Sequence, residues 1–337
     1  MVCEMASAVR KIPRCMSTQH PDNASMPFFS ESPLLEGDAE VKEAYYAFSH
    51  LGCTEQMWDA EGKEVDDYVV RKLLARYDSF FEKNVLGKDV FLTLRVPNPS
   101  VEREEAKVLL ETLESIPRSF DVARSISDGS SDVSAPVFEV ILPMTSSSSE
   151  LNRIYHYYSD FVAGKENKPL FDTTVRDWIG SFDPEAINVI PLFETKEQML
   201  SSAQIVDEYL KGKDFSYQRV FLARSDPALN YGSLSAVLIN KIAVKRIYEL
   251  EQRLGIPLPV ILGAGSCPFR GNLRPDNTNN CLKGYPSVRT FTIQSAFKYD
   301  YEEESVRKAI ADINDAPCGE PYFVDEAQCL DIIERVS

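Results

Sequence analysis

The sequence of 337 residues is long enough to bury a large core, as one big domain or as two of ordinary size. Hydrophobic residues make up 44% and charged residues 26% of it, which is an ordinary globular composition, and no apolar run approaches the length of a membrane span. The net charge of −16 would repel nucleic-acid phosphates and argues against a nucleic-acid partner. An anionic substrate would need a pocket that gathers arginines against this overall charge.

The cysteines and the N-terminal stretch indicate the compartment. Seven cysteines, an odd number, are scattered without a CxxC pair, which argues against a disulfide framework and against a structural zinc site. The first 15 residues lack the apolar stretch of a secretion signal. The sequence therefore predicts a cytoplasmic protein that does not contact a membrane.

One histidine lies near the N-terminus in an unusual local sequence. The stretch "CMSTQHPDN" (15–23) holds one of only three histidines. Pro21 fixes its own φ and biases His20 toward an extended backbone, and Asp22-Asn23 is typical of a turn. This frame favours an imidazole held in one direction. The alternative is a surface loop that happens to carry a histidine.

Residues 35–87 have a helical pattern. Apolar side chains recur at three-to-four spacing in "EGDAEVKEAYYAFSHLGC" and "EVDDYVVRKLLARYDSFFEKNVLG". Gly52 and Gly87 stand where helices would end. We expect a helical region here.

After residue 88, short apolar runs alternate with longer amphipathic stretches. Strands are predicted at 89–96, 137–144, 187–194, 219–226, 259–266 and 289–297. Helices are predicted at 101–115, 147–164, 195–212, 232–255 and 301–313, and 126–136 as a loop. The alternation of nearly continuous apolar strands with helices is typical of a parallel sheet or a (β/α) barrel.

Polar residues at the ends of these strands suggest a site, because sites form where parallel strands hand over to loops. Arg95, Glu194 and Asp226 each end a predicted strand, and Arg270 lies in the glycine-rich turn "GAGSCPFRGN" after the next one. Two carboxylates on different strands suit Mg²⁺ or Mn²⁺, and arginines with free backbone N–H groups suit phosphate and carboxylate. The pattern predicts a pocket for a small molecule that is both phosphorylated and carboxylated.

Each of these residues has a plainer explanation. Glu194 could cap the helix that begins near Thr195, and Asp226 could cap the one that begins at "PALNYGSLSA". The glycine-rich turn is not a P-loop and not a G-x-G-x-x-G fingerprint. The coincidence on successive strand ends is the stronger signal.

Seven motifs together resemble a known family. They are "MSTQHPDN", "FLTLRVPNPSVE", "VILPMTSS", "VIPLFET", "ARSDPALNYGSLSA", "GAGSCPFRGNL" and "TFTIQSAFKYDY", which in this order resemble the archaeal-type phosphoenolpyruvate carboxylases. The resemblance runs from about Ile12 to about Asp315. It implies a lyase that joins phosphoenolpyruvate and bicarbonate to give oxaloacetate and inorganic phosphate, through carboxyphosphate and an enolate stabilised by Mg²⁺ or Mn²⁺. It also implies a homo-oligomer, a tetramer.

The resemblance assigns roles to single residues. It makes His20 and Arg270 catalytic and Glu194 and Asp226 the metal ligands. It places Arg95 and Arg270 in the substrate site, where the backbone N–H groups of the glycine-rich turn, at Gly265 and Ser266, are predicted to bind substrate as well. A base near neutral pKa at His20 would take the proton of carboxyphosphate.

The chain also departs from the larger bacterial and plant relatives. Leu262 and Ala264 stand where those have a histidine and an arginine, and Leu229 where they have a lysine. The chain also ends earlier than family members do. Two other functions remain open: an Mg²⁺-dependent, enolate-forming lyase or aldolase on the same barrel, and an inactive, truncated subunit.

The expected fold is an α-rich, TIM-barrel-like (β/α) fold of the α/β class. With six strands found where eight are needed, the barrel is expected to be incomplete at the C-terminus. The predicted division is an N-terminal segment with the catalytic histidine (1–34), a helical region packed on the barrel (35–87) and the barrel portion (88–337), all in one catalytic domain.

Overall fold

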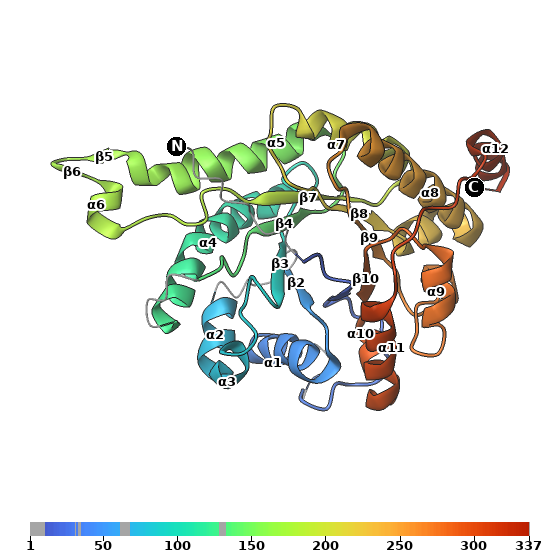
Figure 1. Ribbon diagram of the computed structural model, residues 1–337, viewed down its shortest axis with the longest axis horizontal. Helices are drawn as coiled ribbons and strands as arrows, with labels where there is room; N and C mark the ends of the chain where they lie inside the picture. The colour runs from blue at the N-terminus through green and yellow to red at the C-terminus, as the bar shows by residue number, and fades with distance from the viewer. Residues whose placement is uncertain (1–10, 31, 33–34, 61–67, 128–132, 337) are drawn as a thin grey trace.

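A computed structural model describes residues 11–30, 32, 35–60, 68–127 and 133–336. Its centre is a closed barrel of parallel strands (Figure 1). The barrel strands are β1 (Cys15–Ser17), β2 (Glu55–Asp59), β3 (Phe91–Arg95), β4 (Glu139–Leu142), β7 (Asn188–Phe193), β8 (Val220–Ala223), β9 (Val260–Gly263) and β10 (Thr290–Ile293). The TIM-barrel-like α/β fold predicted from the sequence is confirmed.

The barrel is complete, so the expectation of an open, unfinished barrel is wrong. The strand order is β1-β10-β9-β8-β7-β4-β3-β2, and β1 closes the circle by pairing with both β10 and β2. The two strands that the sequence did not reveal are β1 and β2. β1 has only three residues, and β2 carries polar Glu55 and Gln56 within a region whose helical periodicity dominates. Without an open barrel, exposed strand edges no longer argue that this chain is unstable.

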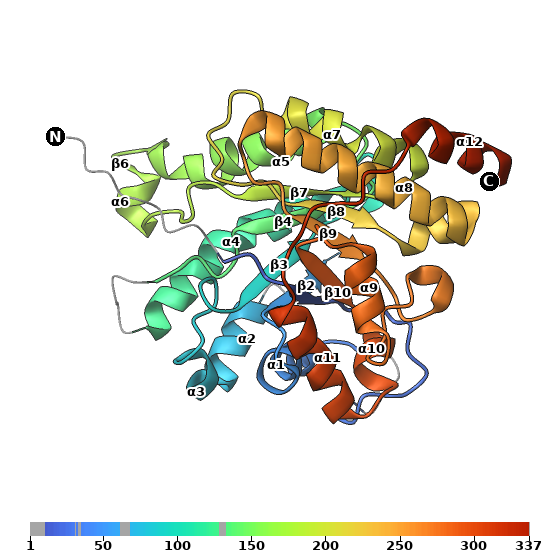
Figure 2. The same cartoon turned by 45° about the vertical axis from the view of Figure 1, so that its right-hand side comes forward.

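Helices cover the outside of the barrel (Figures 1 and 2). They are α1 (Asp38–Tyr46), α2 (Val69–Arg76), α3 (Asp78–Phe81), α4 (Ala106–Ile126), α5 (Ser148–His156), α6 (Val175–Ile179), α7 (Lys196–Leu210), α8 (Ser225–Leu254), α9 (Thr278–Gly284), α10 (Ser295–Tyr299), α11 (Glu303–Asp315) and α12 (Glu326–Val336). Short π or 3-10 turns are η1 (Ala47–Leu51), η2 (Arg103–Glu105), η3 (Tyr157–Val162), η4 (Ala163–Asn167) and η5 (Pro268–Arg270). A small hairpin of β5 (Pro169–Leu170) and β6 (Thr173–Thr174) lies outside the barrel. Among the helices of the described segments, none is long and apolar enough to cross a membrane.

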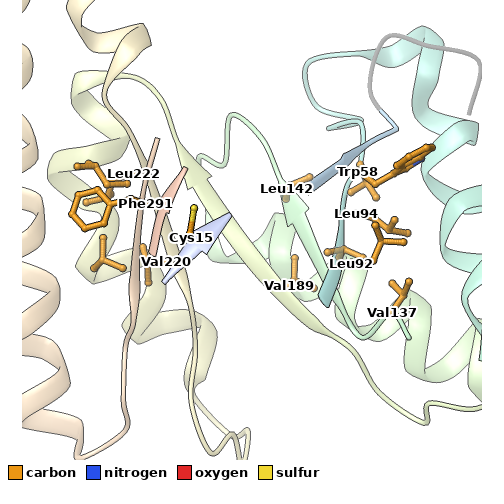
Figure 3. Close-up of a cluster of buried hydrophobic side chains, with 14 of the residues drawn as sticks. Cys15, Trp58, Leu92, Leu94, Val137, Leu142, Val189, Val220, Leu222 and Phe291 are labelled. Carbon is orange, nitrogen blue, oxygen red and sulfur yellow. The ribbon is translucent and has the colours of Figure 1, made fainter. Parts of the chain in front are cut away.

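Alternation along the strands builds two apolar clusters. In β8, Val220 and Leu222 belong to the cluster between strands and helices, whereas Phe221 and Ala223 belong to a smaller second cluster. The second cluster draws on barrel strands alone, as expected for side chains that point inward. Figure 3 shows outward-facing side chains, Leu222 and Trp58 among them, between strands and helices.

The N-terminal end of the barrel is closed by a buried ion cluster. Arg219, just before β8, binds Glu55 at 2.6 Å and Glu139 at 3.0 Å, and these begin β2 and β4. All three side chains have at most 1% of their surface exposed. Tyr217 donates a further hydrogen bond to Glu139. This end of the barrel is therefore filled, and a ligand site must lie at the other end.

Replacing Arg219 with Met is expected to destabilise the protein strongly. The substitution leaves the buried carboxylates of Glu55 and Glu139 without their cation. Breaking a buried ion pair from one side costs about 3–5 kcal/mol. Urea unfolding measures the difference. The exposed pair of Arg335 and Asp331 provides the control, because Arg335→Met is expected to change the free energy of unfolding by less than about 1 kcal/mol.

Candidate active site

Five of the predicted site residues meet at the C-terminal end of the barrel. His20 follows β1, Arg95 ends β3, Glu194 follows β7, Asp226 lies in the first turn of α8, and Arg270 ends η5 after β9. These five side chains line one cavity of about 300 Å³. The sequence spreads them over 250 positions, and parallel strands bring them to one mouth because all eight strands end there.

His20 faces Arg270 across the cavity. Nη1 of Arg270 lies 2.6 Å from Nε2 of His20. A guanidinium has only donors, so Nε2 accepts and the neutral ring carries its proton on Nδ1. Burial lowers the pKa of His20, and the positive charge of Arg270 lowers it further. The imidazole is therefore neutral near pH 7 and able to accept a proton.

The start of α10 fixes the backbone that carries His20. The carbonyl oxygen of His20 accepts hydrogen bonds from the hydroxyl of Ser295 at 2.7 Å and from its N–H at 3.2 Å. The N–H of Ala296 donates to the carboxylate of Asp22 at 2.7 Å. These contacts hold the His-Pro-Asp turn, so its stiffness comes from tertiary contacts as well as from proline.

A buried lysine also fixes the segment that leads to His20. The ammonium of Lys298 donates to the carbonyl oxygen of Thr18 at 2.8 Å and to Glu43 at 2.8 Å. Its side chain has no exposed surface. Thr18 itself lines the cavity. Lys298 therefore ties the approach to His20 to helix α1.

Glu194 does not cap a helix. Thr195 is the N-cap of α7, where its hydroxyl accepts the N–H of Gln198 in a capping box. The carboxylate of Glu194 accepts the N–H of Met144 at 2.5 Å. Burial raises the pKa of Glu194 to about 7, and the nearby charge of Asp226 adds to the shift. The cap explanation for Glu194 is wrong, and the carboxylate is set close to a second one.

Asp226 is the nearby second carboxylate. It lies in the first turn of α8, whose N-cap position is Arg224, so Asp226 does not cap this helix either. Within the part of the chain that the structure describes, no group of three or more His, Cys, Asp or Glu side chains forms a metal cage. Mg²⁺ needs no such cage, because it commonly takes one or two carboxylates and fills its other positions with water and substrate. A buried carboxylate repelled by its neighbour fits a cation that binds between the two.

In EDTA, Glu194→Gln is expected to stabilise the protein at pH 8 by about 1–3 kcal/mol. A folded-state pKa of about 7 against an ordinary 4.5 corresponds to roughly 3 kcal/mol of penalty on the charged form. The penalty is full above pH 7 and absent below pH 4.5, where Glu194 is protonated in both folded and unfolded states. Glutamine keeps an acceptor for the N–H of Met144. Urea unfolding should show the gain at pH 8 and its loss at pH 4.5, and an equal effect at both would contradict the account.

Arg95 is oriented by an aspartate that the sequence did not single out. The Nε of Arg95 donates to Asp59 at 3.0 Å, and Nη2 of Arg95 pairs with the second carboxylate oxygen. Asp59 in turn has its backbone N–H bound by the side chain of Gln19 at 2.8 Å. Asp59 ends β2, so the rule of strand ends would have found it had this strand been recognised.

The glycine-rich loop is braced from within. The N–H of Gly265 donates to the carbonyl oxygen of Arg270 at 2.9 Å, and the hydroxyl of Ser266 donates to Leu273 at 3.1 Å. A Cβ on Gly265 would lie 2.5 Å from Oε1 of Gln294. Gly265 and Ser266 do not line the cavity. Their visible role is to shape the loop that presents Arg270, and direct substrate contact by either remains a prediction.

Two further polar residues of the cavity were missed. Gln294 and Ser225 are buried, line the cavity, and each keep a buried oxygen that has no hydrogen-bond partner among the described residues. Gln294 directly follows β10, but the predicted strand ran on to residue 297 and hid this end. The floor between the polar groups is apolar, formed by Met57, Leu192 and Phe221.

The positions that depart from the larger relatives lie away from the cavity. Leu229 is exposed, and Leu262 and Ala264 are buried in the main core cluster. Arg224 packs beneath the loop and donates to the carbonyl oxygen of Phe269 at 2.9 Å. Arg224, which directly follows β8, therefore braces this loop from beneath.

Comparison with known proteins shows the family of this chain. The family model described as phosphoenolpyruvate carboxylase matches residues 12–337. Proteins named phosphoenolpyruvate carboxylase from Methanothermobacter thermautotrophicus, Methanospirillum hungatei and Pyrococcus abyssi are 60%, 56% and 54% identical to this chain. The matches cover 96% of this chain and 66%, 67% and 68% of those proteins. The chain thus spans about two thirds of the length of the curated relatives it matches, and it belongs to the phosphoenolpyruvate carboxylase family.

Proposed function

We propose that this protein carboxylates phosphoenolpyruvate with bicarbonate, giving oxaloacetate and inorganic phosphate. The observation that carries the proposal is the meeting of His20, Arg95, Glu194, Asp226 and Arg270 in one cavity, in a member of this family. The cavity combines two cations and two carboxylates with an apolar floor. It can hold a small anion and keep part of it dry.

Glu194 and Asp226 would hold Mg²⁺ or Mn²⁺. When bound, the cation supplies positive charge that stabilises the negative charge developing on the enol oxygen of the substrate. Arg95 and Arg270 would bind the phosphate and carboxylate groups as forks, and Asp59 keeps Arg95 in position. This arrangement suits phosphoryl transfer, which depends on positioning and charge neutralisation.

In the first step a bicarbonate oxygen attacks phosphorus, and the bond between phosphorus and the enol oxygen breaks. The products are carboxyphosphate and the enolate of pyruvate. Arg270 turns toward the migrating phosphoryl group, which frees Nε2 of His20. That nitrogen then accepts the carboxyl proton of carboxyphosphate.

Loss of this proton allows the bond between the carboxyl carbon and the bridging oxygen to break, giving CO₂ and phosphate. The enolate carbon then attacks CO₂ and forms oxaloacetate. The apolar floor of Met57, Leu192 and Phe221 excludes water, which would otherwise protonate the enolate to pyruvate. His20 and the dry floor thus serve the second half of the reaction.

Phosphate release from phosphoenolpyruvate, measured with Mn²⁺ in bicarbonate-free and in bicarbonate-containing buffer, tests the proposal. We expect release that requires bicarbonate and is matched by oxaloacetate. Phosphate release without bicarbonate, or cleavage of another carboxylic acid instead, would favour the enolate-forming lyase or aldolase. No turnover by the purified chain would favour the truncated, inactive subunit.

We further propose a cytoplasmic enzyme that works as a homo-oligomer, a tetramer by resemblance to its family. The net charge of −16 supports a small-molecule substrate instead of nucleic acid. The division into segments 1–34, 35–87 and 88–337 also stays a proposal, with the added finding that the first two each supply one barrel strand.

A further inference from the structure

One part of the chain projects away from the barrel. Residues 161–182, here called the arm, contain β5, β6 and α6 and extend beyond the ring of helices (Figures 1 and 2). Helix α12 lies on the opposite side of the barrel in both views. The arm contributes nothing to the cavity at the mouth of the barrel.

The arm is unusually apolar at its surface. Among the described residues, sixteen large hydrophobic side chains are exposed, and five of them fall in these 22 positions, where about one is expected by length. They are Phe161, Leu170, Phe171, Trp178 and Ile179, with 62%, 40%, 104%, 68% and 55% of their surface accessible. Concentrations of this kind mark interaction surfaces, whereas scattered single residues do not.

The arm is held in shape by its own polar contacts. One carboxylate oxygen of Glu166 pairs with Arg176 at 3.0 Å, and the other accepts the N–H of Phe182 at 3.0 Å. The hydroxyl of Thr174 caps α6 by accepting the N–H of Asp177 at 3.1 Å. Its apolar side chains are thus presented on a pre-organised frame, which lowers the entropic cost of binding.

The turn of the hairpin holds an exposed phenylalanine in an unfavourable backbone conformation. Phe171 forms the turn between β5 and β6, and its φ of 52° lies in the left-handed region. This region is unfavourable for a residue with a Cβ, and glycine or asparagine is the usual choice. Strain at an exposed aromatic side chain points to a role for that side chain in contact with something else.

The arm has no net charge, and this bears on which partner it could bind. Lys165, Lys168 and Arg176 balance Glu166, Asp172 and Asp177, so the arm is neutral in a chain of net charge −16. Two copies of such a chain carry the same net charge of −16, and contact through neutral arms adds no further repulsion. A basic partner would gain no net charge attraction from a neutral arm. The neutral arm therefore fits a second copy of this chain best.

We propose that the arm is the surface through which two copies of this chain associate about a two-fold axis. Its exposed aromatic and aliphatic side chains offer on the order of 600 Å², taking 150–250 Å² for each aromatic residue. With the polar rim of the hairpin, this approaches the roughly 800 Å² per partner of a stable interface. A two-fold contact is self-complementary, which suits an arm that carries both signs of charge.

Light scattering coupled to size-exclusion chromatography of the 337-residue chain tests the proposal. The wild type is expected at twice the 38.0 kDa of one chain or a higher multiple. Phe171→Asn removes the aromatic ring but suits the left-handed backbone, so it is expected to weaken association at least tenfold without lowering thermal stability. Val101→Asn changes an exposed apolar residue outside the arm, with 55% of its surface accessible, and is expected to leave the mass unchanged.

A charge variant separates this contact from general stickiness. Lys168→Glu gives each arm a net charge of −2, and two arms then repel each other at low salt. Raising the ionic strength to 0.5 M should restore association of Lys168→Glu but not of Phe171→Asn. A monomeric wild type at 50 µM would overturn the proposal, because another occupant would then cover the arm. Association unchanged in both arm variants would overturn it as well.

Discussion

Replacing His20 with Asn is expected to abolish oxaloacetate formation in any form of the protein that carboxylates phosphoenolpyruvate. The first transfer needs only bound substrates and positive charge, so bicarbonate-dependent release of phosphate should continue at a reduced rate. Without Nε2 as acceptor, carboxyphosphate keeps its proton, and the enolate is lost as pyruvate. Asparagine keeps a side chain that can accept from Arg270.

The measurement is a product balance of oxaloacetate, pyruvate and phosphate in one reaction. The expected loss of oxaloacetate is at least about 100-fold, the usual contribution of a general base. His156→Asn is the matched control, because this exposed histidine on α5 pairs with Asp160 far from the cavity. Oxaloacetate formation near the wild-type rate by His20→Asn would remove His20 from the mechanism.

The second large effect is expected on metal binding. Glu194→Gln and Asp226→Asn should each weaken Mn²⁺ binding tenfold or more, about 1.4 kcal/mol, because a neutral amide does not replace an anionic ligand. Removing both should abolish specific binding, since no third His, Cys, Asp or Glu of the described residues joins the pair.

Calorimetric titration or electron paramagnetic resonance of Mn²⁺ gives the affinity without any turnover. Glu197→Gln is the control, because this carboxylate lies only three residues from Glu194 but is exposed on the outside of α7. Unchanged affinity in both site variants would mean that the two carboxylates serve only the local structure.

The sequence predicted the ends of long, apolar strands well. β3, β7 and β8 are largely apolar, and the polar residues at or just after their ends, Arg95, Glu194 and Asp226, all line the cavity. A barrel strand is buried on both faces, so its end is the place where a charged side chain can reach a cavity. The same rule needs no knowledge of tertiary contacts.

The rest could not be predicted, for two physical reasons. β1 and β2 owe their strand conformation to closure of the barrel, and three residues of β1 carry no periodicity that a sequence pattern could reveal. Contacts between side chains and partners far along the chain also leave no pattern in the sequence. Lys298 directly follows the predicted strand at 289–297, yet its buried ammonium donates to the carbonyl oxygen of Thr18, 280 positions away.

For Asp226 the sequence predicted the place in the cavity but not the secondary structure. The predicted strand at 219–226 ended with Asp226 and the predicted helix began at 232, but β8 ends at Ala223 and α8 begins at Ser225 with a kink at Gly232. Gly232 has a φ of 82°, which no helix interior adopts. In the sequence this glycine therefore marks a helix boundary, and the helix was predicted to begin there. The kink separates a short segment that carries Asp226 from the long helix that packs on the barrel.

The central claim, carboxylation through carboxyphosphate, is tested most directly with bicarbonate labelled by ¹⁸O in all three oxygens. Oxaloacetate is trapped by reduction to malate, and malate and phosphate are analysed by mass spectrometry. Attack of bicarbonate on phosphorus predicts one ¹⁸O in each phosphate and two in the new carboxyl group. Phosphate without label, its new oxygen coming from water, would contradict the account and leave the cavity with a different reaction.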